Sequence, residues 1–224
     1  MLSLVSLIME GVCVDPQLHA PFTMCISGAT KSGKSTLTGQ FLERRNEIIK
    51  TGNGLPINKI LYCYTEDQPA FFSKLKTSIP SIEFHKGLPE DFSEARNGIV
   101  VLDDLMNEAS KSDDACAAFT RTSHHQNICL IILVQNFFYK NIRNITTNCH
   151  FLCIMKNPRD SSFLSTLGRQ MNGGKKNAVM ESAFKECMAK PYGYLFVDLS
   201  QEQNDLFRFR NNIFPDECTV FVPK

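Results

Sequence analysis

The residues best suited to chemistry in this chain form one short glycine-rich segment. It reads Gly28, Ala29, Thr30, Lys31, Ser32, Gly33, Lys34, Ser35 and Thr36, and it fits the pattern G-x-x-x-x-G-K-[ST]. Glycines let the backbone curl so that successive N–H groups point inward at a phosphate. Lys34 would neutralise the β- and γ-phosphates, and the Ser35 hydroxyl would bind Mg²⁺, which prefers hard oxygen ligands. We therefore expect this whole segment to bind ATP together with magnesium.

Two aspartates, Asp103 and Asp104, follow the apolar run 98–102. In open α/β sheets, ligands bind at the carboxyl ends of the strands, which is the edge that also carries a phosphate loop. Asp103 would hold the magnesium shell through water, and Asp104 would polarise the attacking water. Glu66 also follows an apolar run, 61–64, and is an alternative base that the sequence cannot separate from Asp104.

A neutral amide ends another apolar run. Gln135 and Asn136 follow the apolar run 131–134. The Gln135 amide at that place can hydrogen-bond the γ-phosphate or the attacking water, and so report whether the phosphate is still present. We count Gln135 with Lys34 and Asp104 among the expected catalytic residues.

These residues require a sheet that presents them at one edge. Short apolar runs alternate with helical patterns, which predicts an α/β fold with a mainly parallel sheet flanked by helices. The expected strands cover 22–27, 59–64, 99–103, 128–134 and 150–155, and the expected helices cover 34–50, 109–125, 161–171 and 178–189. Two further strands, 193–199 and 206–209, predict a C-terminal antiparallel extension.

Composition sets broad limits. The chain has 224 residues and a formal net charge of +1, with 24 basic and 23 acidic residues, so bulk charge does not indicate a nucleic-acid partner. We expect an N-terminal appendage, 1–21, and one ATPase domain, 22–224. The nine cysteines are expected to be reduced in an intracellular compartment. The apolar run 1–9 is too short to span a bilayer, so we expect no membrane association and a strand or short helix there.

The order of these motifs resembles a known group of proteins. A phosphate loop, then an Asp-Asp strand, then a strand ending in glutamine is the order of RecA-like P-loop NTPases of the additional-strand, catalytic-glutamate type. Within that group the chain resembles FtsK/HerA-superfamily DNA-packaging ATPases, closest to those of polinton (Maverick) elements, adintoviruses and virophages, and more distantly of poxviruses. Besides the phosphate loop, the blocks that carry the resemblance are 101–105, 119–125, 133–136, 156–160 and 191–194. Many relatives place Glu after the first Asp, whereas this chain has Asp104.

The resemblance implies a homo-oligomeric ring, a pentamer or hexamer, that hydrolyses ATP and drives double-stranded DNA into a capsid. It further implies a capsid vertex protein as partner and a location in the host nucleus, a virus factory or the virion. An arginine from the neighbouring subunit would complete each site. Arg121 is preferred for this role and Arg159 is the alternative. DNA phosphates would be held by exposed basic residues, for which the candidates are Lys140, Arg143, Lys175, Lys176, Arg208 and Arg210.

Two other functions fit the phosphate loop. A small-molecule kinase of the nucleotide kinase type has the same loop and a similar size, although the paired aspartates and the strand ending in glutamine argue against it. A nucleotide-dependent assembly scaffold that binds ATP without hydrolysing it is also compatible with Asp104 in place of Glu.

Overall fold

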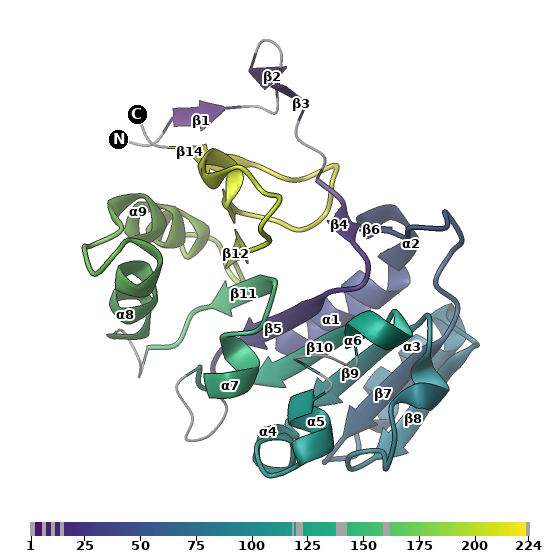
Figure 1. Cartoon of the computed structure of the whole chain (residues 1–224). Coiled ribbons are helices and arrows are strands. Elements are labelled where there is room, and N and C mark those ends of the chain that lie inside the picture. Colours follow the sequence, from purple (N-terminus) through teal and green to yellow (C-terminus); the bar gives the residue numbers. More distant parts are fainter. Residues whose placement is uncertain are drawn as a thin grey trace.

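A twisted sheet runs through the whole protein (Figure 1). The structure is a computed structural model that describes residues 3–5, 8–9, 12–13, 16–117, 119, 123–137, 143–158 and 162–222. Within these residues the main sheet has ten strands in the order β1-β14-β13-β12-β11-β5-β10-β9-β7-β8. Their bounds are β1 Ser3–Val5, β5 Thr23–Ser27, β7 Ile60–Tyr64, β8 Ile82–Lys86, β9 Ile99–Asp103, β10 Cys129–Val134, β11 Phe151–Met155, β12 Tyr194–Asp198, β13 Phe209–Arg210 and β14 Val220–Val222.

The strands from β11 to β8 are parallel to one another. Strand β10 lies between β5, which leads into the phosphate loop, and β9, which ends at Asp103. An additional strand thus separates the loop from the acidic strand, which agrees with the additional-strand class that the motif order resembles. Strands β12, β13, β14 and β1 continue the sheet in antiparallel fashion. The predicted fold class is confirmed.

Helices cover both faces of this sheet, as Figure 1 shows. Their bounds are α1 Lys34–Glu43, α2 Arg45–Ile48, α3 Pro69–Ser78, α4 Met106–Ala109, α5 Asp113–Ala117, α6 Ser123–Gln126, α7 Arg143–Thr146, α8 Ser162–Met171 and α9 Ala178–Cys187, with 3₁₀ turns η1 Ser93–Ala95 and η3 Asp205–Phe207. Residues of α1 and α3 share one buried cluster with the strands, and residues of α4, α5, α8 and α9 share the other. Because both faces are covered, every residue of β5, β9 and β10 is buried.

The short segments at the N-terminal end are strands. Strand β1 pairs with β14 at one edge of the main sheet. Strands β2 (Ile8–Met9) and β3 (Val12–Cys13) form an antiparallel pair, and β4 (Leu18–His19) pairs in parallel with β6 (Ile49–Lys50). We find no helix among the described residues whose length and apolar character would suit a bilayer crossing.

Three expected elements are wrong in part. The helix predicted over 34–50 ends at Glu43, resumes as α2 and then becomes β6. The helix predicted over 109–125 is interrupted after α4, although residues 118 and 120–122 are not described. Of the strand predicted over 206–209, Leu206 and Phe207 lie in the 3₁₀ turn η3, and only Phe209 lies in a strand, β13.

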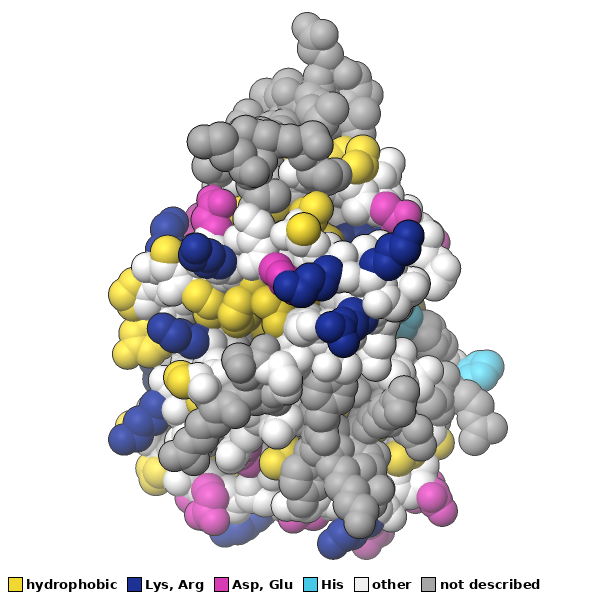
Figure 2. Space-filling view, turned by 90° about the vertical axis from the view of Figure 1, so that its left-hand side faces the viewer, with side chains coloured by type: hydrophobic (Ala, Val, Ile, Leu, Met, Phe, Trp, Pro, Cys, Tyr) yellow, Lys and Arg dark blue, Asp and Glu magenta, His cyan; other side chains and the backbone are white. Residues whose placement is uncertain are grey.

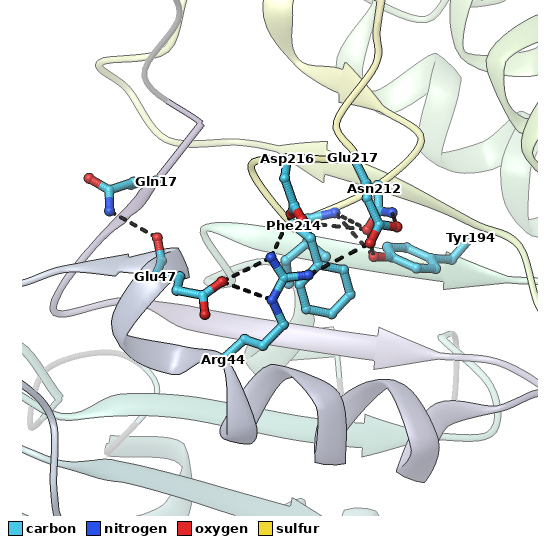
Figure 3. A network of polar contacts seen from close by, with 9 residues as sticks. Gln17, Arg44, Glu47, Tyr194, Asn212, Phe214, Asp216 and Glu217 are labelled. Atoms are coloured by element: carbon cyan, nitrogen blue, oxygen red, sulfur yellow. Dashed lines mark hydrogen bonds and ion pairs between the residues drawn. The ribbon is translucent and has the colours of Figure 1, made fainter.

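Arg44 explains the first of these breaks. It lies between α1 and α2, and its guanidinium forms ion pairs with Glu47 at 2.9 Å and Asp216 at 2.5 Å. The guanidinium carbon also lies 4.6 Å from the centre of the Phe214 ring. Figure 3 shows this network joining the α1–α2 junction to the C-terminal segment. A contact with a residue so distant in sequence cannot be read from the helical pattern of 34–50.

Arg210 fixes the antiparallel extension from inside. Its side chain is 1% exposed and donates to the Asp198 carboxylate at 3.0 Å. Breaking a buried ion pair from one side leaves the other charge without its partner, which typically costs about 3–5 kcal/mol. We therefore expect Arg210→Ala to lower the free energy of unfolding by about 3 kcal/mol or more, measured by urea denaturation.

Arg44→Ala is the matched control, because it removes an arginine from solvent-exposed ion pairs. Such pairs contribute little in water, so its loss of stability should be clearly smaller than that of Arg210→Ala. Equal losses would contradict a special role for the buried pair.

Candidate nucleotide-binding site

The phosphate loop lies between β5 and α1 and has the tight backbone that its glycines predict. The Gly28 amide donates to the Val134 carbonyl at 3.1 Å, which ties the start of the loop to β10. A Cβ on Gly28 would come within 2.5 Å of Ser32 Oγ. Gly33, with φ of 104°, turns the chain into α1. These two positions therefore require glycine, and Ser35 and Thr36 fall in the first turn of the helix, where amides are free to bind an anion.

Lys34 reaches back over this loop. Its Nζ donates to the carbonyl oxygens of Gly28 at 2.8 Å and Ala29 at 3.2 Å, and the residue is 8% exposed. Burial lowers the pKa of the ammonium, and the nearby carboxylates of Asp104 and Asp103 oppose that shift. Lys34 is therefore a buried cation held between the loop and two acids, where it can meet a bound phosphate.

Asp103 ends β9 and is 4% exposed. Its Oδ2 accepts hydrogen bonds from the Tyr62 hydroxyl at 2.7 Å and from Gln68 Nε2 at 3.3 Å. Burial raises the pKa of this carboxyl, as does the charge of Asp104, whereas the Tyr62 hydrogen bond and the Lys34 charge lower it.

This arrangement fits magnesium. The ion is typically bound through one or two protein oxygens, waters and substrate phosphates rather than by a cage of side chains. The Ser35 hydroxyl at the start of α1 and the Asp103 carboxylate, which is close enough to Lys34 to affect its pKa, are oxygen ligands of that kind. Ser35 and Asp103 would hold the ion, and the bound ion would neutralise phosphate charge.

Asp104 lies just beyond the strand and points toward the glutamine. Its φ of 55° is in the left-handed region, which few residues other than glycine, asparagine and aspartate adopt. Gln135 Nε2 donates to Asp104 Oδ1 at 3.3 Å, and Asn157 Nδ2 donates to the backbone carbonyl of Gln135 at 3.3 Å. Polar residues that follow β9, β10 and β11 are thus linked in a chain beside the phosphate loop.

Glu66, the alternative base, lies in the loop after β7 and is exposed. The residue of this loop that contacts Asp103 is Gln68. Glu66 lies near Lys86, whose ammonium is paired with Asp67 at 3.0 Å. The pKa of Lys86 is raised mainly by the Asp67 hydrogen bond, and the charge of Glu66 adds a small part. The geometry therefore favours Asp104 over Glu66, and the role of either acid stays a prediction.

The predicted arginine and DNA contacts are only partly described. Arg121, Arg159 and Lys140 lie outside the described residues, as does the side chain of Arg143, the first residue of α7. Lys175 and Lys176 are exposed in the loop between α8 and α9. Two expectations need correction. Arg210 is buried against Asp198, and Arg208 donates to Asp205 at 2.7 Å and to the Asp198 carbonyl at 2.9 Å, so both serve the extension and Arg210 cannot reach DNA.

Sequence reasoning missed three polar neighbours of the site. Tyr62 and Gln68 contact Asp103, and Asn157 contacts Gln135. The signal for Asn157 was present, because it belongs to one of the blocks that carry the family resemblance. Tyr62 and Gln68 had no such signal, since their contact depends on β7 pairing beside β9.

Solved ATPase structures are similar to this chain. The cytoplasmic domain of the type VII secretion ATPase EccC from Thermomonospora curvata gives a TM-score of 0.53 at 11% identity, over 93% of this chain and 26% of that chain. EssC (ATPases 2 and 3) from Geobacillus thermodenitrificans gives a TM-score of 0.51 at 13% identity, over 90% of this chain and 39% of that chain. The genome packaging NTPase B204 from Sulfolobus turreted icosahedral virus 2, in complex with ATP-gammaS, gives a TM-score of 0.49 at 15% identity, over 85% of this chain and 96% of that chain.

No family model and no curated protein matches the sequence. At these identities the structural likeness to EccC and EssC concerns the fold. Together with the phosphate loop and the position of β10, it defines the chain as a protein of the P-loop NTPase fold.

Proposed function

We propose that this chain is an ATP-hydrolysing motor that translocates double-stranded DNA into a viral capsid. The observation that carries the proposal is the meeting of Lys34, Asp103, Asp104 and Gln135 at one edge of the sheet. A hydrogen bond connects Gln135 to Asp104, and the charges of Asp104 and Asp103 act on Lys34. This set contains a phosphate-binding cation, a magnesium ligand, an acid for the attacking water and an amide that can sense the γ-phosphate.

The chemistry follows from this geometry. A triphosphate bound by the loop amides would take over the Lys34 ammonium from the carbonyls of Gly28 and Ala29. Asp103 and Ser35 would hold magnesium, which would supply positive charge to the phosphates. Asp104 would accept the proton of the attacking water. When the γ-phosphate leaves, the Gln135 side chain would lose one partner and keep its hydrogen bond to Asp104.

The DNA and capsid parts of the proposal depend on the sequence resemblance. In a ring of identical subunits, Arg121, or Arg159 as the alternative, would approach the γ-phosphate of the neighbouring site. Lys175 and Lys176, with Lys140 and Arg143, would contact DNA phosphates, and a capsid vertex protein would anchor the ring at the host nucleus or virus factory. Figure 2 views the side of the molecule where α8 and α9 lie, and Lys and Arg side chains spread across it around a hydrophobic patch.

The test is DNA-dependent ATP hydrolysis. We expect double-stranded DNA to raise the rate of phosphate release by the assembled protein, and Lys175→Glu with Lys176→Glu to reduce that stimulation while leaving hydrolysis without DNA unchanged. Each lost phosphate contact should also lower the slope of log affinity against log salt by about 1. The control is Lys74→Glu with Lys111→Glu, which makes the same charge change at exposed positions in α3 and in the turn after α4 and should keep the stimulation.

Three results would contradict the proposal. A rate of ATP hydrolysis that double-stranded DNA does not change would contradict the motor function. Tight ATP binding with almost no phosphate release would favour the assembly scaffold. Transfer of the γ-phosphate to a nucleoside or nucleotide would favour the kinase.

A further inference from the structure

Tyr192 is the most exposed large hydrophobic side chain among the described residues, at 74%. It belongs to the block 191–194, whose role the proposed chemistry does not explain. The backbone at Tyr192 has φ of 57°, which is unusual for a bulky residue. At the next residue, Gly193, a Cβ would come within 2.0 Å of the Cys187 carbonyl oxygen. The turn after α9 therefore places the tyrosine on the surface at a cost in backbone strain.

That place is directly beside the phosphate loop. A Cβ built on Gly33 would lie 3.3 Å from Tyr192 Cδ1, so the ring lies against the last glycine of the loop. A cavity of about 490 Å³ opens here, and Tyr192, Lys34, Ser35, Thr36 and Gln40 are among its lining residues. Small-molecule sites commonly have volumes of about 300–1,000 Å³, so a nucleoside fits next to phosphates bound at Lys34 and Ser35.

Thr36 and Gln40 form the α1 side of this cavity. They are four residues apart in the helix and so lie on the same side of it, and both are exposed. Tyr194 also lines the cavity, but its hydroxyl is already used, since it donates to Asn212 at 2.6 Å (Figure 3) and accepts from the Ile213 amide at 3.1 Å. The Gln40 amide carries both a donor and an acceptor, which can exchange places by rotation of the amide.

We propose that Tyr192 is the stacking surface for the nucleobase of the bound nucleotide, with Gln40 contacting the edge of the base. The inference rests on the proposed binding of a nucleoside triphosphate at Lys34. Aromatic stacking accepts every base because each has a π-face, and a rotatable amide can satisfy the edge of adenine or of guanine. The site should therefore accept purine nucleoside triphosphates with little discrimination between ATP and GTP.

The experiment compares ligands with and without a base. Calorimetric titration of the assembled protein uses Mg-ATP, Mg-GTP and Mg-tripolyphosphate. Tyr192→Ala should weaken Mg-ATP binding by about tenfold or more, from the usual strength of base stacking, and leave the affinity for Mg-tripolyphosphate unchanged. Tyr192→Phe should bind ATP as the wild type does. Leu206→Ala, which trims another exposed apolar residue, is the control and should change neither affinity.

The possible outcomes separate this inference from the proposed function. If Tyr192→Ala loses affinity for ATP and for tripolyphosphate equally, the ring only supports Gly33. If its affinity for ATP is unchanged, the ring contacts no base. Either result overturns the inference while the phosphate site stands. A preference of wild type for one purine by more than about a hundredfold would overturn the role of Gln40 as a base contact that either purine satisfies. A wild type that binds neither ATP nor tripolyphosphate overturns the proposed function and this inference together.

Discussion

Lys34→Ala should lower the rate of ATP hydrolysis by about 10³-fold or more and weaken Mg-ATP binding by at least about tenfold. The ammonium is already in place before any ligand arrives, held by the carbonyls of Gly28 and Ala29. Its charge also lowers the pKa of Asp103. Its loss would remove the side-chain cation that offsets the charge of the two acids and the triphosphate.

Phosphate release and calorimetric titration measure the two effects. The variant should remain folded, because the core around β5 and α1 is built by apolar side chains such as Met24 and Leu37, which the substitution leaves in place. A single cooperative unfolding transition would verify this. The control Lys74→Ala, at an exposed position of α3, should hydrolyse ATP normally. Turnover by Lys34→Ala within about tenfold of wild type would show that the loop is not the phosphate site.

Much of the central sheet could be predicted because its strands are continuous apolar runs. Strands β5, β9 and β10 are buried on both faces, so each run stands out from the polar segments around it. The motif order also resembled the additional-strand class, and β10 lies between the strand that leads into the phosphate loop and the acidic strand. These features are local in sequence or belong to a motif of fixed order.

What the sequence could not predict depends on contacts between distant segments. The helix break at Arg44 depends on Asp216 and Phe214. The burial of Arg210 depends on Asp198 across the antiparallel extension, whereas sequence alone shows only a basic residue near the C-terminus. Strand β8 and helix α3 were not expected, because each has only one buried residue and therefore a weak apolar pattern.

The candidate site divides in the same way. The residues that the motifs name, among them Lys34, Asp103 and Gln135, lie together as the carboxyl-edge rule predicts. The residues that orient them do not belong to any motif. Tyr62 reaches Asp103 only because β7 pairs with β9 in a register that places Tyr62 opposite Val101, two residues before the aspartate.

Asp104→Asn should lower the rate of ATP hydrolysis by about 10²- to 10⁴-fold, the usual contribution of a general base, while ATP affinity stays within a few-fold of wild type. The substitution is close to a pure removal of charge. Asparagine also tolerates the left-handed backbone that Asp104 adopts, and its side-chain oxygen can still accept the Gln135 hydrogen bond. Asp103 would still hold the magnesium, so the variant should bind ATP almost normally and hydrolyse it slowly.

Glu66→Gln is the matched variant, since it removes one carboxylate from a neighbouring strand end without changing side-chain size. It should hydrolyse ATP at nearly the wild-type rate, because Gln68, not Glu66, is the residue of that loop that reaches Asp103. Single-turnover phosphate release with saturating Mg-ATP measures both variants at the chemical step. The reverse pattern, with Asp104→Asn active and Glu66→Gln inactive, would assign the base to the loop after β7. The loop would then have to bring Glu66 toward the γ-phosphate when nucleotide binds, although its neighbour Asp67 is paired with Lys86 at 3.0 Å.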